Sequence, residues 1–106
     1  MTKYLFQASY TVDGVKGLLK EGASSRKTAI EHLIKGMGGS VEAFYFAFGD
    51  ADVYVIGELP NNETAAALSL AVYASGAVNI KTTVLMTVEE VDRATKMTVN
   101  YRPPGA

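Results

Sequence analysis

The sequence contains no cysteine. This absence excludes disulfide bonds, thiolate metal sites, iron–sulfur clusters and cysteine nucleophiles. His32 is the only histidine, so a metal site built from several histidines of one chain is excluded as well. We therefore expect a protein without a bound metal or cofactor.

An excess of charge of one sign is also lacking, because 10 lysines and arginines stand against 11 aspartates and glutamates. Nucleic acids and anionic membranes both bind proteins through a basic face, so we expect neither as the main partner. The N-terminus lacks the apolar segment of a signal peptide, and no apolar run approaches the length of a membrane span. A cytoplasmic location is the default expectation.

The chain does have the composition of a globular domain. Its 106 residues fit one domain, and 48% of them are apolar, which is enough to build a core. Patterns of period two, typical of strands, alternate with patterns in which apolar residues recur at helical spacing. The sequence predicts strands at 4–10, 41–48, 52–59 and 78–86, and helices from 24 or 25 to about 37 and from 62 to 75.

The order of these elements predicts an α+β domain with a ferredoxin-like βαββαβ core. Right-handed crossovers place both helices on one face of a four-stranded antiparallel sheet. The segment 11–22 is polar and contains three glycines, so we expect a loop there. A hydroxyl of Ser24 or Ser25 is expected to cap the first helix, and residues 49–51 are expected to form a tight hairpin turn.

Capping residues indicate where the later helices begin. Asn61 is placed to cap the second helix. Thr87 and Glu90 have the spacing of a capping box, which predicts a short third helix. The residues after it, 97–106, include two consecutive prolines and a glycine and are expected to form an arm or tail, so that the domain proper spans 1–96.

The second helix has an unusual composition. Between Ala65 and Ala74 only Ser69 and the hydroxyl of Tyr73 are polar. A helix that is apolar on all sides is usually covered on more than one side. In a chain this short, we expect the second cover to come from another element or another subunit.

Alternation along the strands separates the two faces of the sheet. The helix-facing side is predicted to carry large apolar residues: Tyr4, Phe6, Ala8, Phe44, Phe46, Phe48, Val53, Val55, Val78, Ile80, Thr82, Val84 and Met86. The opposite side would carry Leu5, Gln7, Ser9, Tyr45, Asp52, Tyr54, Ile56, Glu58, Lys81, Thr83 and Leu85. That mixture is too apolar for water and too polar for a dry core. We predict a homodimer in which two such faces enclose a partly polar cavity; the alternative is a half-solvated face crossed by the C-terminal arm.

The polar side chains of that cavity are the candidate site residues: Gln7, Ser9, Tyr45, Asp52, Tyr54, Lys81 and Thr83. A tyrosine or lysine in a partly dry cavity can act as a general acid, a general base or an oxyanion donor. Alternatively, Lys81 pairs with Asp52 or Glu58 in the interface and the tyrosines pack about the two-fold axis.

Asp50 and Asp52 lie two residues apart around the predicted turn. Such a pair can share a proton or hold a cation. The simpler interpretation is turn chemistry, because aspartate accepts backbone N–H groups in turns.

Two cationic or titratable side chains lie on the first predicted helix. Arg26 falls in its first turn, where the helix dipole disfavours a cation, so Arg26 is a candidate for binding an anion. The alternatives are a solvated side chain or a pair with a carboxylate. His32 lies off the apolar stripe, and we expect it to be solvated.

Three segments resemble the GYD-domain family: the run FYFAFGDADVYVI at 44–56, ELPNNE at 58–63 and SGAVNIKTT at 75–83. The resemblance extends from residue 11 to residue 90. It implies a dimeric α/β barrel, in which two ferredoxin-like sheets pack face to face. Related dimeric barrels include small monooxygenases, lactone isomerases and ligand sensors, so the resemblance implies a fold and no particular reaction.

One departure from the family pattern bears on chemistry. Gly49 and Asp52 match the Gly-Tyr-Asp feature for which the family is named, but Ala51 stands where tyrosine is usual. If that tyrosine does chemistry in the family, this member has lost it. The more cautious inference is that the tyrosine was never a required catalyst.

The sequence thus leaves three classes of function. The leading hypothesis is a homodimeric domain that binds a small molecule or serves as a scaffold. The alternative is a cofactor-independent enzyme, monooxygenase-like or isomerase-like, with Tyr45, Tyr54, Asp52 and Lys81 as acid–base groups. The third is a structural protein that assembles through its second helix.

Overall fold

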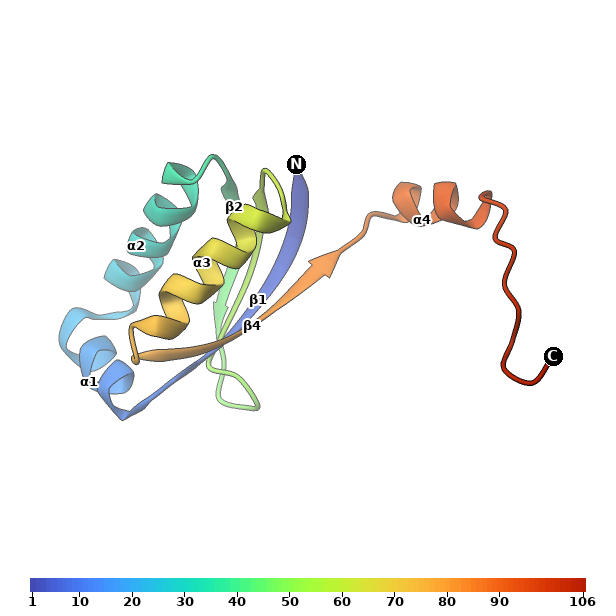
Figure 1. Ribbon diagram of the computed structural model, residues 1–106. Coiled ribbons are helices and arrows are strands. Elements are labelled where there is room, and N and C mark those ends of the chain that lie inside the picture. The colour runs from blue at the N-terminus through green and yellow to red at the C-terminus, as the bar shows by residue number, and fades with distance from the viewer.

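The computed structural model describes residues 1–106 (Figure 1). In chain order its elements are β1 (Thr2–Tyr10), α1 (Val12–Glu21), α2 (Ala23–Gly36), β2 (Ser40–Phe46), β3 (Val53–Leu59), α3 (Asn62–Ala74), β4 (Val78–Leu85) and α4 (Val88–Thr95). The four strands form one sheet in the order β2-β3-β1-β4, and every neighbouring pair is antiparallel. Helices α1, α2 and α3 cover one face of this sheet. The predicted α+β class and the ferredoxin-like arrangement are confirmed.

The core lies between the covered sheet face and the two long helices. Tyr4, Phe6 and Val55 of the sheet are buried together with Ile34 of α2 and Leu68 of α3. Tyr4 and Phe6 of β1 are two positions apart, as the alternation requires for side chains on one face. Val55 of β3 lies directly opposite Phe6 and shares that face. The division of the strands into a helix-facing side and an opposite side is therefore correct along their central parts.

The segment predicted as a loop at 11–22 is instead the helix α1. The side chain of Thr11 caps it and accepts the backbone N–H of Gly14 at 3.3 Å. A β-carbon on Gly14 would lie 2.0 Å from the carbonyl oxygen of Ala77. Glycine is therefore needed here because the helix approaches the start of β4 closely, and it does not mark a break in the helix.

Helices α1 and α2 are separated by a single residue, Gly22. Its N–H donates to the carbonyl oxygen of Leu18 at 2.8 Å, which ends α1, and its φ of +91° turns the chain into α2. Because α2 begins at Ala23 with no side-chain cap, the predicted cap by Ser24 or Ser25 is wrong.

The tight turn predicted at 49–51 is a longer loop, residues 47–52. The backbone N–H of Ala47 donates to the carbonyl oxygen of Asp52 at 2.8 Å and closes it. Phe48 lies in this loop and is fully exposed, so its predicted place under the helices is wrong. Alternation predicts the sheet face on which a side chain lies only for residues that belong to a strand.

The predicted caps of the last two helices are confirmed. The side-chain oxygen of Asn61 accepts the N–H of Thr64 at 2.9 Å at the start of α3. Thr87 and Glu90 form a reciprocal capping box on α4, with both hydrogen bonds present. The bond from the Thr87 backbone holds the pKa of Glu90 below its ordinary value.

Helix α4 and the residues after it leave the body of the domain as an arm (Figure 1). Every residue from 86 to 106 is exposed except Glu90, which is half-buried. The radius of gyration is 17.0 Å, against about 13 Å for a compact chain of this length. The arm therefore does not lie across the sheet of its own chain.

The outer side of α3 also lacks a cover from this chain, because Leu70 and Tyr73 are exposed. Only 12 of the 106 residues are buried. The chain thus presents a large apolar surface on the arm, on α3 and on the uncovered sheet face, which is typical of a chain that contacts another molecule.

Candidate functional site

The uncovered sheet face carries a row of four polar side chains, one from each strand. The strand register pairs Tyr45 with Tyr54, Tyr54 with Gln7, and Gln7 with Lys81. Directly opposed residues share a face, and strands lie about 4.8 Å apart, so the row spans roughly 14 Å. The structure therefore brings these four predicted candidates onto one surface, with Tyr45 and Lys81 at its two edges.

The next row along the strands is mostly apolar. Leu5 lies opposite Ile56 on one side and opposite Thr83 on the other, and Ile56 lies opposite Ala43. Leu5 and Ile56 are only half-buried in the chain. The predicted mixture of apolar and polar side chains on this face is thus present, and Thr83 is at its edge.

Charged side chains close one end of this face. Lys3 forms an ion pair with Glu42, with 2.8 Å between Nζ and the carboxylate oxygen. The hydrogen bond to Glu42 raises the pKa of Lys3 above its ordinary value. Glu42 reaches Lys3 from an irregularity in β2, where the register with β3 shifts between Val41 and Ala43.

Asp52 and Ser9 lie at the other end of the face, beside the hairpin loop. The carboxylate of Asp52 accepts the backbone N–H of Tyr10 at 2.8 Å, and the hydroxyl of Ser9 donates to the carbonyl oxygen of Asp50 at 3.4 Å. The carboxylate of Asp52 therefore holds the end of β1, which is the backbone-satisfying role of a turn aspartate.

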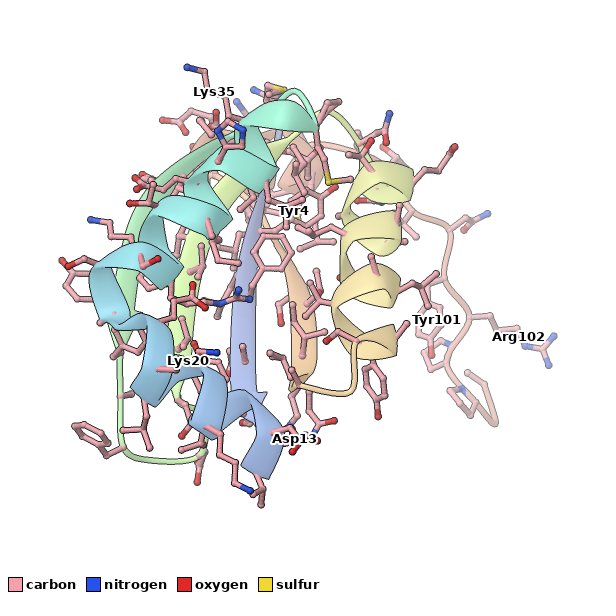
Figure 2. All side chains as sticks on the ribbon, turned by 90° about the vertical axis from the view of Figure 1, so that its left-hand side faces the viewer. Tyr4, Asp13, Lys20, Lys35, Tyr101 and Arg102 are labelled. Carbon is pink, nitrogen blue, oxygen red and sulfur yellow. The ribbon has the colours of Figure 1, made fainter.

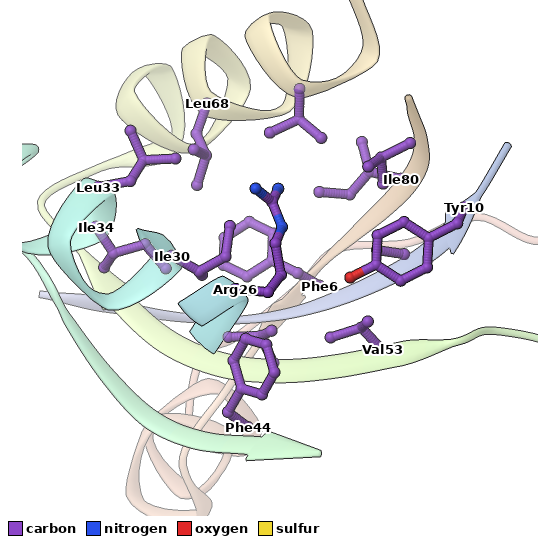
Figure 3. A pocket seen from close by; sticks show the side chains of 14 residues that line it. Phe6, Tyr10, Arg26, Ile30, Leu33, Ile34, Phe44, Val53, Leu68 and Ile80 are labelled. Carbon is purple, nitrogen blue, oxygen red and sulfur yellow. The ribbon is translucent and has the colours of Figure 1, made fainter. Parts of the chain in front are cut away.

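A cavity lies on the other side of the sheet, between α2 and α3. Figure 2 shows the two helices flanking the strands, and Figure 3 shows the cavity from close by. The part of the cavity that lies against the sheet, which we call the floor, has a volume of about 50 Å³. It is lined by Phe6, Ala8, Tyr10, Arg26, Ile30, Leu33, Ile34, Phe44, Val53, Val55, Leu68, Val72, Val78 and Ile80.

The floor continues into a wider mouth of about 350 Å³ beside α1. The mouth is lined by Tyr10, Asp13, Gly14, Gly17, Leu18, Glu21, Arg26, Leu33, Ala71, Val72, Ser75, Ala77 and Val78. Five residues border both parts: Tyr10, Arg26, Leu33, Val72 and Val78. These shared residues form the border at which the floor opens into the mouth.

Arg26 and Tyr10 supply the polar groups at the junction of floor and mouth (Figure 3). Arg26 is half-buried, and its guanidinium lies within ion-pair distance of no carboxylate. Burial raises the pKa of Tyr10, and the neighbouring Arg26 partly offsets this rise. Of the two alternatives to anion binding at Arg26, a pair with a carboxylate is therefore absent, and the side chain is not fully solvated either.

The cavity has no motif in the sequence, and Tyr10 is not among the predicted site residues. The available signal was Arg26, a cation in a helix turn that disfavours one. His32 is exposed on α2, as predicted. No three His, Asp or Glu side chains lie close enough together to hold a metal ion. None of the helices has the length and apolar character needed to cross a membrane.

Comparison with known proteins places the chain in a family. No curated protein and no solved structure matches the sequence. The family model of the GYD domain matches residues 4–95, which include β1 from Tyr4 onward and the whole of the other three strands and all four helices. The chain therefore belongs to the GYD-domain family.

Proposed function

We propose that this GYD domain works as a homodimer that encloses a small organic molecule between two sheets. One observation carries the proposal: the sheet face opposite the helices is half apolar, and nothing in its own chain covers it. Tyr45 on this face is exposed, and Leu5 and Ile56 are half-buried. Full burial of an aliphatic side chain contributes about 1.5–3 kcal/mol, so a second copy of the face is a favourable cover.

The polar row gives the enclosed space its chemistry. In a two-fold pair of sheets, the hydroxyls of Tyr45 and Tyr54, the amide of Gln7 and the ammonium of Lys81 occur twice around one chamber. They supply hydrogen-bond donors from several directions, and Leu5 and Ile56 supply apolar contact. This combination suits a small molecule with both oxygen atoms and a hydrocarbon part.

The arm contributes to the same dimer. Val88 and Val91 on α4, and Val99 and Tyr101 after it, are exposed. Much of the apolar surface of these side chains is left uncovered by the chain itself. An arm that leaves the domain beside β4 lies at the edge of the proposed interface, where it can pack on the second copy.

The hydrogen bond that Asp52 accepts favours a binding role over a catalytic one. An enzyme of the kind considered above would use Asp52 with Tyr45, Tyr54 and Lys81 as acid–base groups. The carboxylate of Asp52 already accepts the N–H of Tyr10. One oxygen of this carboxylate is therefore engaged in holding the end of β1, which accounts for an aspartate at this position without a catalytic role.

Light scattering at micromolar concentration tests the dimer. We expect the wild type to have twice the mass of one chain and Ile56→Lys to have the mass of one chain, because the substitution buries an unpaired charge in the interface. Ala29→Lys, on the exposed surface of α2, is the matched control and should remain dimeric. A wild-type monomer would refute the proposal, and a mass above that of a dimer would favour assembly through α3.

Native mass spectrometry of the freshly purified dimer tests the enclosed molecule. A mass excess over two polypeptides that denaturation removes, and that is absent from Ile56→Lys, supports a ligand held between the sheets. A dimer without any excess mass contradicts the binding role and leaves a scaffold.

A further inference from the structure

The cavity between α2 and α3 lies on the opposite side of the sheet from the proposed dimer chamber. Its lining residues Phe6 and Val55 lie on the helix-facing side, whereas Gln7 and Tyr54 lie on the uncovered side. The cavity is complete within one protomer. Whatever it binds is therefore independent of the molecule proposed between the sheets.

Arg26 defines the charge of the occupant. It is the one ionic side chain of the floor, because Asp13 and Glu21 border only the mouth. A guanidinium stays protonated at any physiological pH. A charge that is partly removed from water is stabilised by a partner of opposite sign, and no carboxylate of this chain lies within ion-pair distance of Arg26.

Tyr10 adds a second donor beside Arg26 (Figure 3). Burial raises the pKa of Tyr10, so its phenol remains protonated at neutral pH and able to donate. A planar guanidinium fork with a neighbouring hydroxyl matches the two oxygens of a carboxylate.

The floor defines the size and polarity of the rest of the molecule. Apart from Arg26 and Tyr10 it is lined by hydrocarbon side chains such as Ile30, Leu68 and Ile80. A volume of about 50 Å³ holds roughly three to five water-sized groups. A short or branched aliphatic chain fits this space.

The acidic side chains of the mouth disfavour a ligand with a second acidic group. Asp13 and Glu21 border it, and a second carboxylate emerging from the floor would meet these like charges. We infer that the cavity is a binding site for a short aliphatic monocarboxylate, with its carboxylate on Arg26 and Tyr10 and its hydrocarbon part on the floor.

Calorimetric titration of the full chain with 3-methylbutanoate tests this site. Arg26→Gln should weaken binding roughly ten- to hundred-fold, the value expected for loss of a charge-assisted hydrogen bond. Lys27→Gln removes the same charge from the next residue of α2, which is exposed and outside the cavity, and should leave the affinity unchanged. Arg26→Lys keeps the charge without the fork and should give an intermediate affinity.

Further titrations distinguish this site from general attraction. Succinate, which carries a second carboxylate, and 3-methylbutan-1-ol, which carries no charge, should both bind at least roughly tenfold more weakly. Equal affinity of Arg26→Gln and the wild type, equal affinity for succinate, or no heat of binding to the folded wild type would each overturn the inference. Ile56→Lys should still bind 3-methylbutanoate, so failure of the dimer and failure of this site give different results.

Discussion

The carboxylate of Asp52 accepts the backbone N–H of Tyr10 at 2.8 Å, and this hydrogen bond ties the hairpin loop to the end of β1. The side chain of Tyr10 then lies on the helix side, where it borders both parts of the cavity. A residue at the edge of the uncovered face thereby fixes the position of a polar group on the covered one.

Substitution of Asp52 should destabilise the domain. Asp52→Ala leaves the partly buried N–H of Tyr10 without a partner, which costs about 1–3 kcal/mol in the free energy of unfolding. Asp52→Asn retains an accepting oxygen and should recover most of this loss. Asp50→Ala, in the same exposed loop, should stay within about 0.5 kcal/mol of the wild type. Urea denaturation measures all three; equal stability of Asp52→Ala and Asp50→Ala would contradict the structural role.

Two glycines of α1 should respond to alanine in opposite directions. A β-carbon on Gly14 would lie 2.0 Å from the carbonyl oxygen of Ala77, whereas a β-carbon on Gly17 has no atom within 4 Å. Gly14→Ala should therefore destabilise by about 1–3 kcal/mol through overpacking. Gly17→Ala should stabilise by about 0.5–1 kcal/mol, because alanine is the better helix former.

The same denaturation experiment measures this pair. Because Gly17 borders the mouth of the cavity, a larger residue such as leucine at this position should also weaken the binding of 3-methylbutanoate. Destabilisation by Gly17→Ala would show that α1 is not a helix packed as described.

The ionisation of Tyr10 should make the stability of the folded chain depend on pH in the alkaline range. Burial raises its pKa above the ordinary 10.0. The folded state therefore holds this proton more tightly than the unfolded state, so its contribution to stability is complete below pH 10 and is lost as the pH rises through the folded pKa. Tyr10→Phe should lack this decline.

Absorbance of tyrosinate measures the ionisation, as the difference between the titrations of the wild type and Tyr10→Phe. Arg26 lowers the pKa of Tyr10, so Arg26→Gln should shift this step to higher pH. An unchanged midpoint in Arg26→Gln would place the guanidinium away from the phenol.

Removal of the arm should weaken the proposed dimer and leave the rest of the chain folded. The residues after Met86 are exposed except for Glu90, so they add little to the protomer core. Burial of one valine contributes about 1.5–3 kcal/mol, and about 1.4 kcal/mol is tenfold in affinity, so a chain that ends at residue 86 should dissociate at least tenfold more readily. Sedimentation equilibrium measures the dissociation constant of the dimer. An unchanged dissociation constant would indicate that the arm is a solvated tail and not part of the interface.

Much of the fold could be predicted because its signals are local. Alternation with period two placed Phe6 and Val55 under the helices and Gln7 and Tyr54 on the opposite side, as the structure has them. The capping box at Thr87 specified the start of α4. Each of these features depends on residues a few positions apart.

The errors occurred where a local pattern has a distant cause. In the sequence, Gly14 is typical of a loop. In the structure, glycine is needed at this position because Ala77, which is remote in sequence, approaches the helix closely. The cavity was not predicted for the same reason, because it is formed where α2 and α3 pack on the sheet and has no motif of its own. Arg26 was recognised as a candidate, but Tyr10 was not, since only the packing brings them together.

If the uncovered sheet face pairs with a second copy of itself, the contact should shield the tyrosines of this face from nitration by tetranitromethane. Tyr45 on this face is 71% exposed in the protomer and Tyr73 on the outer side of α3 is 60% exposed. In the dimer, peptide mass spectrometry should find Tyr73 nitrated and Tyr45 protected, with the protection lost in Ile56→Lys. Nitration of Tyr45 as fast as that of Tyr73 in the wild type would mean that the sheet face stays open to solvent and does not pair.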